Sequence, residues 1–111
     1  MKTIIAGGRD YRFTVDDWVF LDDIHFVATI TEVVSGGATG ADAEGERWAK
    51  KRGIPVKYFP ADWKTHGKSA GPKRNQQMAE HADAAILFPG GRGTADMLAR
   101  AQQCKLTYWV R

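Results

Sequence analysis

The stretch LFPGGRGTADMLARA, residues 87–101, runs from an apolar segment through three closely spaced glycines into a pattern typical of a helix. A short apolar run that feeds a helix in this way is typical of a buried strand in a parallel sheet. Because glycine has no Cβ, it lets the chain turn with positive φ and lets a ligand approach the backbone. The stretch therefore predicts a parallel α/β sheet with a binding turn at its edge.

The rest of the chain repeats this alternation of strand and helix. Strand-like runs bounded by glycine or proline occur at residues 2–6, 31–35, 55–59, 84–88 and 106–110. Helical patterns lie between them, at residues 14–29, 41–53, 71–82 and 94–104. Strand–helix alternation with right-handed crossovers predicts a single-domain, Rossmann-like α/β fold, in which a doubly wound parallel sheet of about five strands carries helices on both faces.

Two helices have clear expected starts. Thr14 is the expected N-cap of the first helix, and Thr94 is the expected cap of the last. In the first helix, Phe20, Ile24 and Val27 fall at i, i+4 and i+7, which predicts that they share the buried face.

Length, charge and cysteine content narrow the class of protein. The 111 residues suffice for one domain with a core, and no apolar run approaches the roughly 20 residues of a membrane span. The single cysteine, Cys104, cannot form an internal disulfide, so we expect a cytoplasmic protein in which this thiol is buried and inert. The net charge of +3 permits an anionic ligand without requiring one. The histidines have no metal-ligand spacing, so we expect no metal site.

Three of the expected strands end in glycine. They lead into GGR (7–9), SGGATGAD (35–42) and PGGRGTAD (89–96). Ligands bind at the carboxyl ends of parallel strands, where a helix N-terminus offers free N–H groups and a partial positive charge. The last two turns, each followed at once by a helix, therefore predict two anion cradles on one sheet edge. The sequence contains no standard phosphate loop and no dinucleotide fingerprint, so we expect no triphosphate hydrolysis and no redox cofactor.

A family resemblance rests on six longer motifs. They are AGGRDY (6–11), SGGATGAD (35–42), GERWA (45–49), FPADW (59–63), GKSAGPKRNQQM (67–78) and FPGGRGTADM (88–97). The last resembles the PGGxGTxxE motif of the LOG phosphoribohydrolases, and the whole pattern is similar to the cpYpsA-related group of the SLOG superfamily. The resemblance spans nearly the whole chain. It implies a Rossmann-like fold that binds nucleotides or ADP-ribose-type ligands, often as a dimer.

One departure from the LOG motif concerns catalysis. The motif ends in glutamate, but this chain has Met97 there, which can neither take a proton nor stabilise a developing ribosyl cation. The arginine that LOG proteins carry on the preceding helix corresponds to Arg74. Asp96 neighbours the lost glutamate but points about 100° away round a helix. The resemblance therefore leaves phosphoribohydrolase activity in doubt.

Three functions remain open. The leading interpretation is a protein that senses or sequesters a nucleotide-derived or ADP-ribose-like molecule. One alternative is a phosphoribohydrolase in which Arg74 binds phosphate and Asp96 or Glu46 acts as acid–base group. Another is single-stranded nucleic acid binding through the basic loop and exposed aromatics, which the modest charge disfavours.

The predicted ligand contacts gather at the glycine turns and at residues 60–71, a loop long enough to suggest function. They are Gly7, Gly8, Arg9, Ser35, Gly36, Gly37, Thr39, Gly40, Asp42, Lys68, Arg74, Asn75, Pro89, Gly90, Gly91, Arg92, Gly93 and Thr94. Asp42 suits either the helix dipole or a ribose hydroxyl, and Lys68 with His66 suits a lid. Stacking on a base is one alternative for Tyr11 and Trp63.

Several larger side chains within these motifs have plainer interpretations. Trp48, Met78 and Met97 are expected in the core. Arg74 and Asn75, at the start of the third helix, suit helix capping or surface pairing as an alternative to ligand contact.

Overall fold

The sheet contains five parallel strands. The computed structural model describes residues 1–111. The strands are β1 (Lys2–Ala6), β2 (Glu32–Ser35), β3 (Val56–Tyr58), β4 (Ala84–Leu87) and β5 (Thr107–Val110). Their order is β3-β2-β1-β4-β5, and every neighbouring pair is parallel. The chain reverses its direction of travel across the sheet between β1 and β4, which is where a doubly wound sheet opens a crevice.

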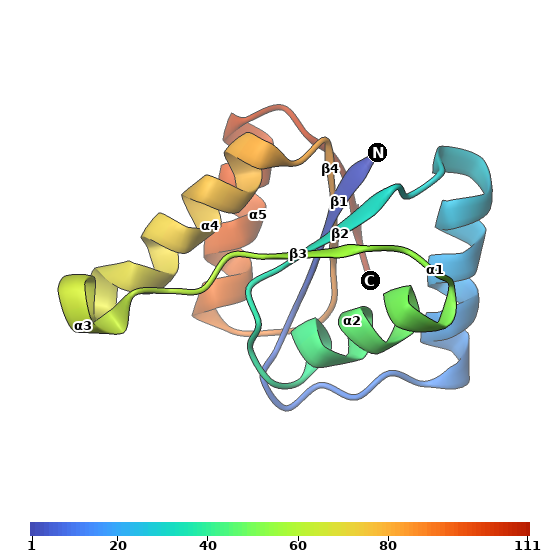
Figure 1. Cartoon of the computed structure of the whole chain (residues 1–111), viewed down its shortest axis with the longest axis horizontal. Helices are drawn as coiled ribbons and strands as arrows, with labels where there is room; N and C mark the ends of the chain where they lie inside the picture. The colour runs from blue at the N-terminus through green and yellow to red at the C-terminus, as the bar shows by residue number, and fades with distance from the viewer.

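Helices cover both faces of this sheet, which confirms the predicted Rossmann-like fold. Figure 1 shows one pair on one side and a second pair on the other. The first pair is α1 (Val15–Ala28) and α2 (Ala41–Lys51), and the second is α4 (Ala70–His81) and α5 (Arg92–Gln103). Between β3 and α4, the short helix α3 (Trp63–His66) and a 3-10 turn (Gly67–Ser69) project from the sheet. None of the helices has the length and apolar content needed to cross a membrane.

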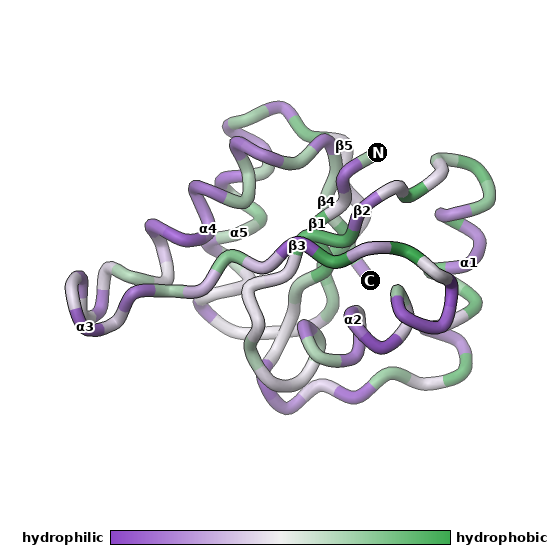
Figure 2. Tube along the Cα trace, viewed as in Figure 1, coloured by the Kyte–Doolittle hydropathy of each residue, from purple (hydrophilic) through white to green (hydrophobic).

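The alternation of side chains along the central strands produces two cores. In β1, Ile5 packs in the core under α1 and α2, whereas Ile4 packs in the core under α4 and α5. Figure 2 shows the hydrophobic stretches gathered in the central strands. Trp48 lies in the first core and Met78 and Met97 in the second, so all three are buried as expected.

The first helix confirms one expectation and corrects another. Thr14 is its N-cap, and a capping box links Thr14 to Asp17. The prediction for Val27 is wrong, because this side chain is 76% exposed. The buried residues of the helix are Asp17, Leu21 and Ile24, and Val27 lies in the last turn at the edge of that stripe, where no other element covers it.

Three further local expectations are wrong. The N-cap of α5 is Gly91, so Thr94 lies inside the first turn, because the chain becomes helical directly after the glycines. Most of residues 60–71 is helical, since Asp62 caps α3 by accepting a hydrogen bond from the Thr65 N–H. Cys104 is the C-cap of α5 and is only half-buried, since the helix ends at the surface.

Candidate functional site

The three glycine turns meet at the carboxyl edge of the sheet and are joined through Gly8. The Gly8 N–H donates to the Pro89 carbonyl at 2.8 Å, and the Gly8 carbonyl accepts from the Ala41 N–H at 3.0 Å. Gly40 has a φ of +73°, and a side chain there would collide with the backbone of Gly8 and Arg9. Glycine is therefore required where these turns touch, and the contacts bring together loops that are far apart in the sequence.

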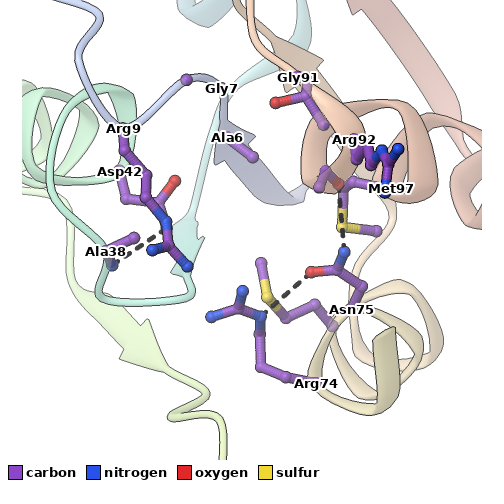
Figure 3. A pocket seen from close by; sticks show the side chains of 14 residues that line it. Ala6, Gly7, Arg9, Ala38, Asp42, Arg74, Asn75, Gly91, Arg92 and Met97 are labelled. Carbon is purple, nitrogen blue, oxygen red and sulfur yellow. Dashed lines mark hydrogen bonds between the residues drawn. The ribbon is translucent and has the colours of Figure 1, made fainter. Parts of the chain in front are cut away.

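A cavity of about 340 Å³ opens beside these turns (Figure 3). Its volume lies within the roughly 300–1,000 Å³ range of small-molecule sites. It is lined by Ala6, Gly7, Gly8, Arg9, Ala38, Asp42, Arg74, Asn75, Met78, Gly91, Arg92, Gly93, Thr94 and Met97. The lining therefore joins the end of β1, the second glycine turn, the start of α2, the inner side of α4 and the first turn of α5.

The first turn of α5 offers unpaired backbone donors to this cavity. Gly91 provides no side-chain cap, and the first backbone bond of the helix runs from the Ala95 N–H to the Gly91 carbonyl at 3.0 Å. The N–H groups of Arg92, Gly93 and Thr94 consequently have no partner within the helix. These N–H groups form the positive end of the helix dipole, which favours an anion at this end of α5.

The turn before α2 differs in part, because three of the N–H groups around it are already bonded. The Gly37 N–H donates to Ser35 Oγ at 3.1 Å, and the Ala38 N–H donates to Asp42 Oδ2 at 3.2 Å. The N–H of Ala41, the first residue of the helix, donates to the first glycine turn, as described above. The N–H groups of Asp42 and Ala43 lack a partner within α2, as those of Gly93 and Thr94 do within α5. The two cradles expected from the sequence are therefore not equivalent, because the α5 end keeps more of its donors available.

Three arginines add positive charge around the cavity. Arg9 and Arg92 are exposed, whereas Arg74 is half-buried. The Arg74 Nη1 donates to the Gly36 carbonyl at 3.0 Å, which fixes the guanidinium at the mouth of the second glycine turn. Burial lowers the pKa of Arg74, and the charge of Asp42 offsets part of this shift. The guanidinium is thus held in a partly dehydrated place, where its attraction for an anion is stronger than in water.

Asp42 is the acidic side chain that lines the cavity. It is 6% exposed, and Figure 3 shows its hydrogen bond with the Ala38 backbone. Burial raises the pKa of this carboxyl above its ordinary value, although the Ala38 hydrogen bond and the Arg74 charge oppose the shift. A buried carboxyl with a raised pKa beside an arginine is an arrangement able to exchange a proton with a bound molecule.

The two other carboxyls considered from the sequence have different partners. Asp96 accepts hydrogen bonds from Asn75 Nδ2 at 2.9 Å and from Arg100 Nε at 2.8 Å. Burial raises the pKa of Asp96, but the hydrogen bonds from Arg100 and Asn75 outweigh this and leave the pKa lowered. Glu46 accepts from Ser35 Oγ at 2.5 Å. Neither Asp96 nor Glu46 lines the cavity.

Two grooves extend from the cavity. One, of about 510 Å³, runs toward α3, and the other, of about 270 Å³, runs along the second glycine turn. Several predicted contact residues lie outside the cavity. Lys68 lines the larger groove, and Gly36, Gly37 and Thr39 line the smaller one. Pro89 and Gly90 line a separate hollow, whereas Ser35 and Gly40 line neither the cavity nor the grooves.

Several lining residues escape prediction from the sequence. Met78 and Met97 lie in the core and also line the cavity, and helical spacing cannot distinguish these two roles. Ala6 and Ala38 carry no functional group, although Ala38 lies inside one of the glycine turns. Tyr11, one candidate for base stacking, is half-buried and does not line the cavity.

Comparison with known proteins adds an independent observation. The family model described as the YspA, cpYpsA-related SLOG family matches residues 1–66, which include β1 to β3 and the first two glycine turns. The Gene 61 protein of Mycobacterium phage D29 is 37% identical, over 92% of this chain and 89% of the phage protein. No solved structure matches the chain.

Proposed function

The chain belongs to the YspA, cpYpsA-related SLOG family, and on this premise we propose that it senses or sequesters a nucleotide-derived small molecule of the ADP-ribose type. Membership of this family suggests binding or processing of nucleotides. The observation that carries the proposal is the uncapped N-terminus of α5, whose free N–H groups line a cavity that also contains three arginines. Backbone N–H groups at a helix N-terminus and guanidinium groups are donors that commonly bind phosphate oxygens, which supports this proposal.

The charge balance of the cavity supports an anionic ligand over a neutral one. The lining contains Arg9, Arg74 and Arg92 but a single acid, Asp42, whose raised pKa favours its neutral form more than usual. Met97, which stands where the LOG motif has glutamate, adds no negative charge to the lining. We therefore place the phosphate between the N-terminus of α5 and Arg74, which line the same cavity.

Thermal unfolding with a matched ligand panel tests this proposal. The panel contains ADP-ribose, AMP and pyrophosphate, with adenosine as the control that lacks a phosphate. At a concentration 100 times Kd, a ligand that binds only the folded state adds about 2.7 kcal/mol, which raises the Tm by roughly 10 °C or more. We expect this shift with phosphorylated compounds and little with adenosine.

A pair of variants locates the binding site. Arg92→Gln removes an exposed cavity charge and should reduce the shift, whereas Arg47→Gln removes an arginine of α2 that lies outside the cavity and should not. If no phosphorylated compound raises the Tm, or if both variants behave alike, phosphate binding at α5 is the wrong assignment.

Hydrolysis of the bound nucleotide is a second candidate, and the position of Asp42 favours it. As a general base, Asp42 would take a proton from a water that attacks C1′ of the ribose while Arg74 holds the phosphate. The N-glycosidic bond would break, and the base would leave with the proton that Asp42 took up. This differs from the roles considered for Asp96 and Glu46, because Asp42 is the carboxyl that lines the cavity. Chromatography of the same nucleotide samples after incubation tests it: products that form with the wild type and not with Asp42→Asn support hydrolysis, and unchanged nucleotides remove it.

A further inference from the structure

The cavity continues past its arginines toward an exposed tryptophan. Arg9 and Arg74 line the cavity and both grooves, so the three spaces are contiguous around these two side chains. Trp63, the first residue of α3, lines both grooves. A molecule anchored at α5 therefore has a continuous path between the arginines to the indole ring.

The indole ring is held in place but left uncovered. Asp62 caps the short helix that carries Trp63, through a 3.2 Å hydrogen bond from the Thr65 N–H. The Cη2 atom of Trp63 lies 3.4 Å from the position that a Cβ at Gly71 would occupy, so one ring edge packs against the start of α4. Even so, Trp63 is 51% exposed. An indole that is fixed at one edge and open on the other side offers a surface for a flat ring.

The charges along the larger groove suit an anion attached to that ring. Lys68 lines this groove together with the cavity arginines. The acid in the groove is Asp96, and its charge is already paired with Arg100 at 2.8 Å. The groove therefore presents positive charge beside an apolar ring face.

We infer, on the basis of the proposed function, that Trp63 is the stacking platform for the base of a nucleotide whose phosphate lies at the N-terminus of α5. The substrate class is then a phosphorylated nucleoside and not a sugar phosphate. Stacking on an aromatic side chain depends on the π-face that every base has, so this contact selects for the presence of a base more than for its identity.

The test compares two ligands that differ only by the base. AMP and ribose 5-phosphate share the phosphate and the sugar, so the ratio of their affinities isolates the contribution of the base. From typical stacking strengths, the wild type should bind AMP roughly 5- to 150-fold more tightly than ribose 5-phosphate, measured by isothermal titration calorimetry.

Three variants assign that ratio to Trp63. Trp63→Leu keeps an apolar side chain but removes the ring, so AMP affinity should fall to that of ribose 5-phosphate, which itself stays unchanged. Trp63→Tyr retains a ring and should preserve most of the ratio. Tyr108→Leu removes a ring that is 41% exposed on the edge strand β5, away from the grooves, and should leave the ratio intact.

The outcomes separate this inference from the proposed function. If the wild type binds both ligands equally, or Trp63→Leu weakens both equally, Trp63 is not a stacking platform, while phosphate binding stands. The inference is also overturned if the ratio survives Trp63→Leu, and an exposed Trp63 would then fit contact with another protein. If neither ligand binds the wild type, the proposed function fails, and this inference fails with it.

Discussion

Replacing Gly36 by Ala tests whether the position of Arg74 controls affinity. The added methyl carbon would stand 2.8 Å from the Arg74 Cζ and would also collide with Nη1. Ordinary contacts begin at 3.4 Å, so the Cζ atom must move by at least 3.4 − 2.8 = 0.6 Å, and the closer Nη1 atom must move further. This movement disrupts the 3.0 Å hydrogen bond from Nη1 to the Gly36 carbonyl and carries the charge away from its place beside the cavity.

The expected cost is larger for binding than for folding. A hydrogen bond to a charged group contributes about 1.5–3 kcal/mol, so its loss to a ligand phosphate weakens binding roughly 10- to 150-fold. For folding, Gly→Ala adds about 0.5 kcal/mol by restricting the unfolded chain, and loss of the Arg74 bond removes about 1.5 kcal/mol, a net loss of about 1 kcal/mol. The variant should therefore remain folded.

Calorimetric titration with ADP-ribose, alongside urea unfolding, measures both effects. Arg74→Gln and the double variant Gly36→Ala/Arg74→Gln complete a double-mutant cycle. If the methyl group acts by displacing Arg74, adding Gly36→Ala to Arg74→Gln should change affinity little. Wild-type affinity in a folded Gly36→Ala protein would refute the reasoning, and so would fully additive losses in the cycle.

The other predictions concern stability. Asp42→Asn should raise the free energy of unfolding at neutral pH, because burial raises the pKa of Asp42 and its charged form opposes folding. This gain in stability should shrink as the pH falls through the raised pKa, because the wild-type carboxyl then becomes neutral. Urea unfolding between about pH 4 and 8 checks this, and a gain independent of pH would contradict it. Gly45→Ala should lower stability by about 1 kcal/mol, because the new methyl would stand 2.6 Å from Ile5 Cγ2 and overpacking outweighs the gain in helix propensity. Gly93→Ala should raise stability by about 0.5–1 kcal/mol, because no atom lies within 4 Å of the added methyl group. Thermal unfolding should therefore shift the Tm of Gly45→Ala and of Gly93→Ala in opposite directions, and shifts in the same direction would be inconsistent with this packing.

Asp96 and Asp42 have partners and burial that the sequence predicts only in part. Spacing round a helix places Asp96 near the motif but cannot identify its partners, and the structure pairs it with Asn75 and Arg100. The sequence marks Asp42 as a candidate ligand contact because it stands at the start of a helix. An acid at that position is explained equally well by the helix dipole and by contact with a ligand. Its burial, and hence its raised pKa, comes from the packing of the turns around it, which no local pattern encodes.

The two glycine-rich turns differ for a similar reason. Both contain the local signals of a cradle, namely glycines directly before a helix. Neither helix has a side-chain cap, and the difference arises from groups that fold against the first turn. Ser35 and Asp42 accept the N–H groups of Gly37 and Ala38, and the Gly8 carbonyl accepts the Ala41 N–H. A sequence motif predicts where donors lie, but it does not predict whether the protein itself has already used them.

The sequence alone determined the order of strands and helices, the doubly wound sheet, and the edge where the glycines lie. These follow from hydrophobic period, from glycine chemistry and from the handedness of crossovers, which act over short stretches of chain. Only the tertiary structure decided which helix end keeps more of its N–H groups available, which carboxyl reaches the cavity, and that Trp63 lines the grooves beside it. Those features depend on contacts between segments far apart in the chain, such as Arg74 with Gly36, and such contacts exist only once the sheet has brought the segments together.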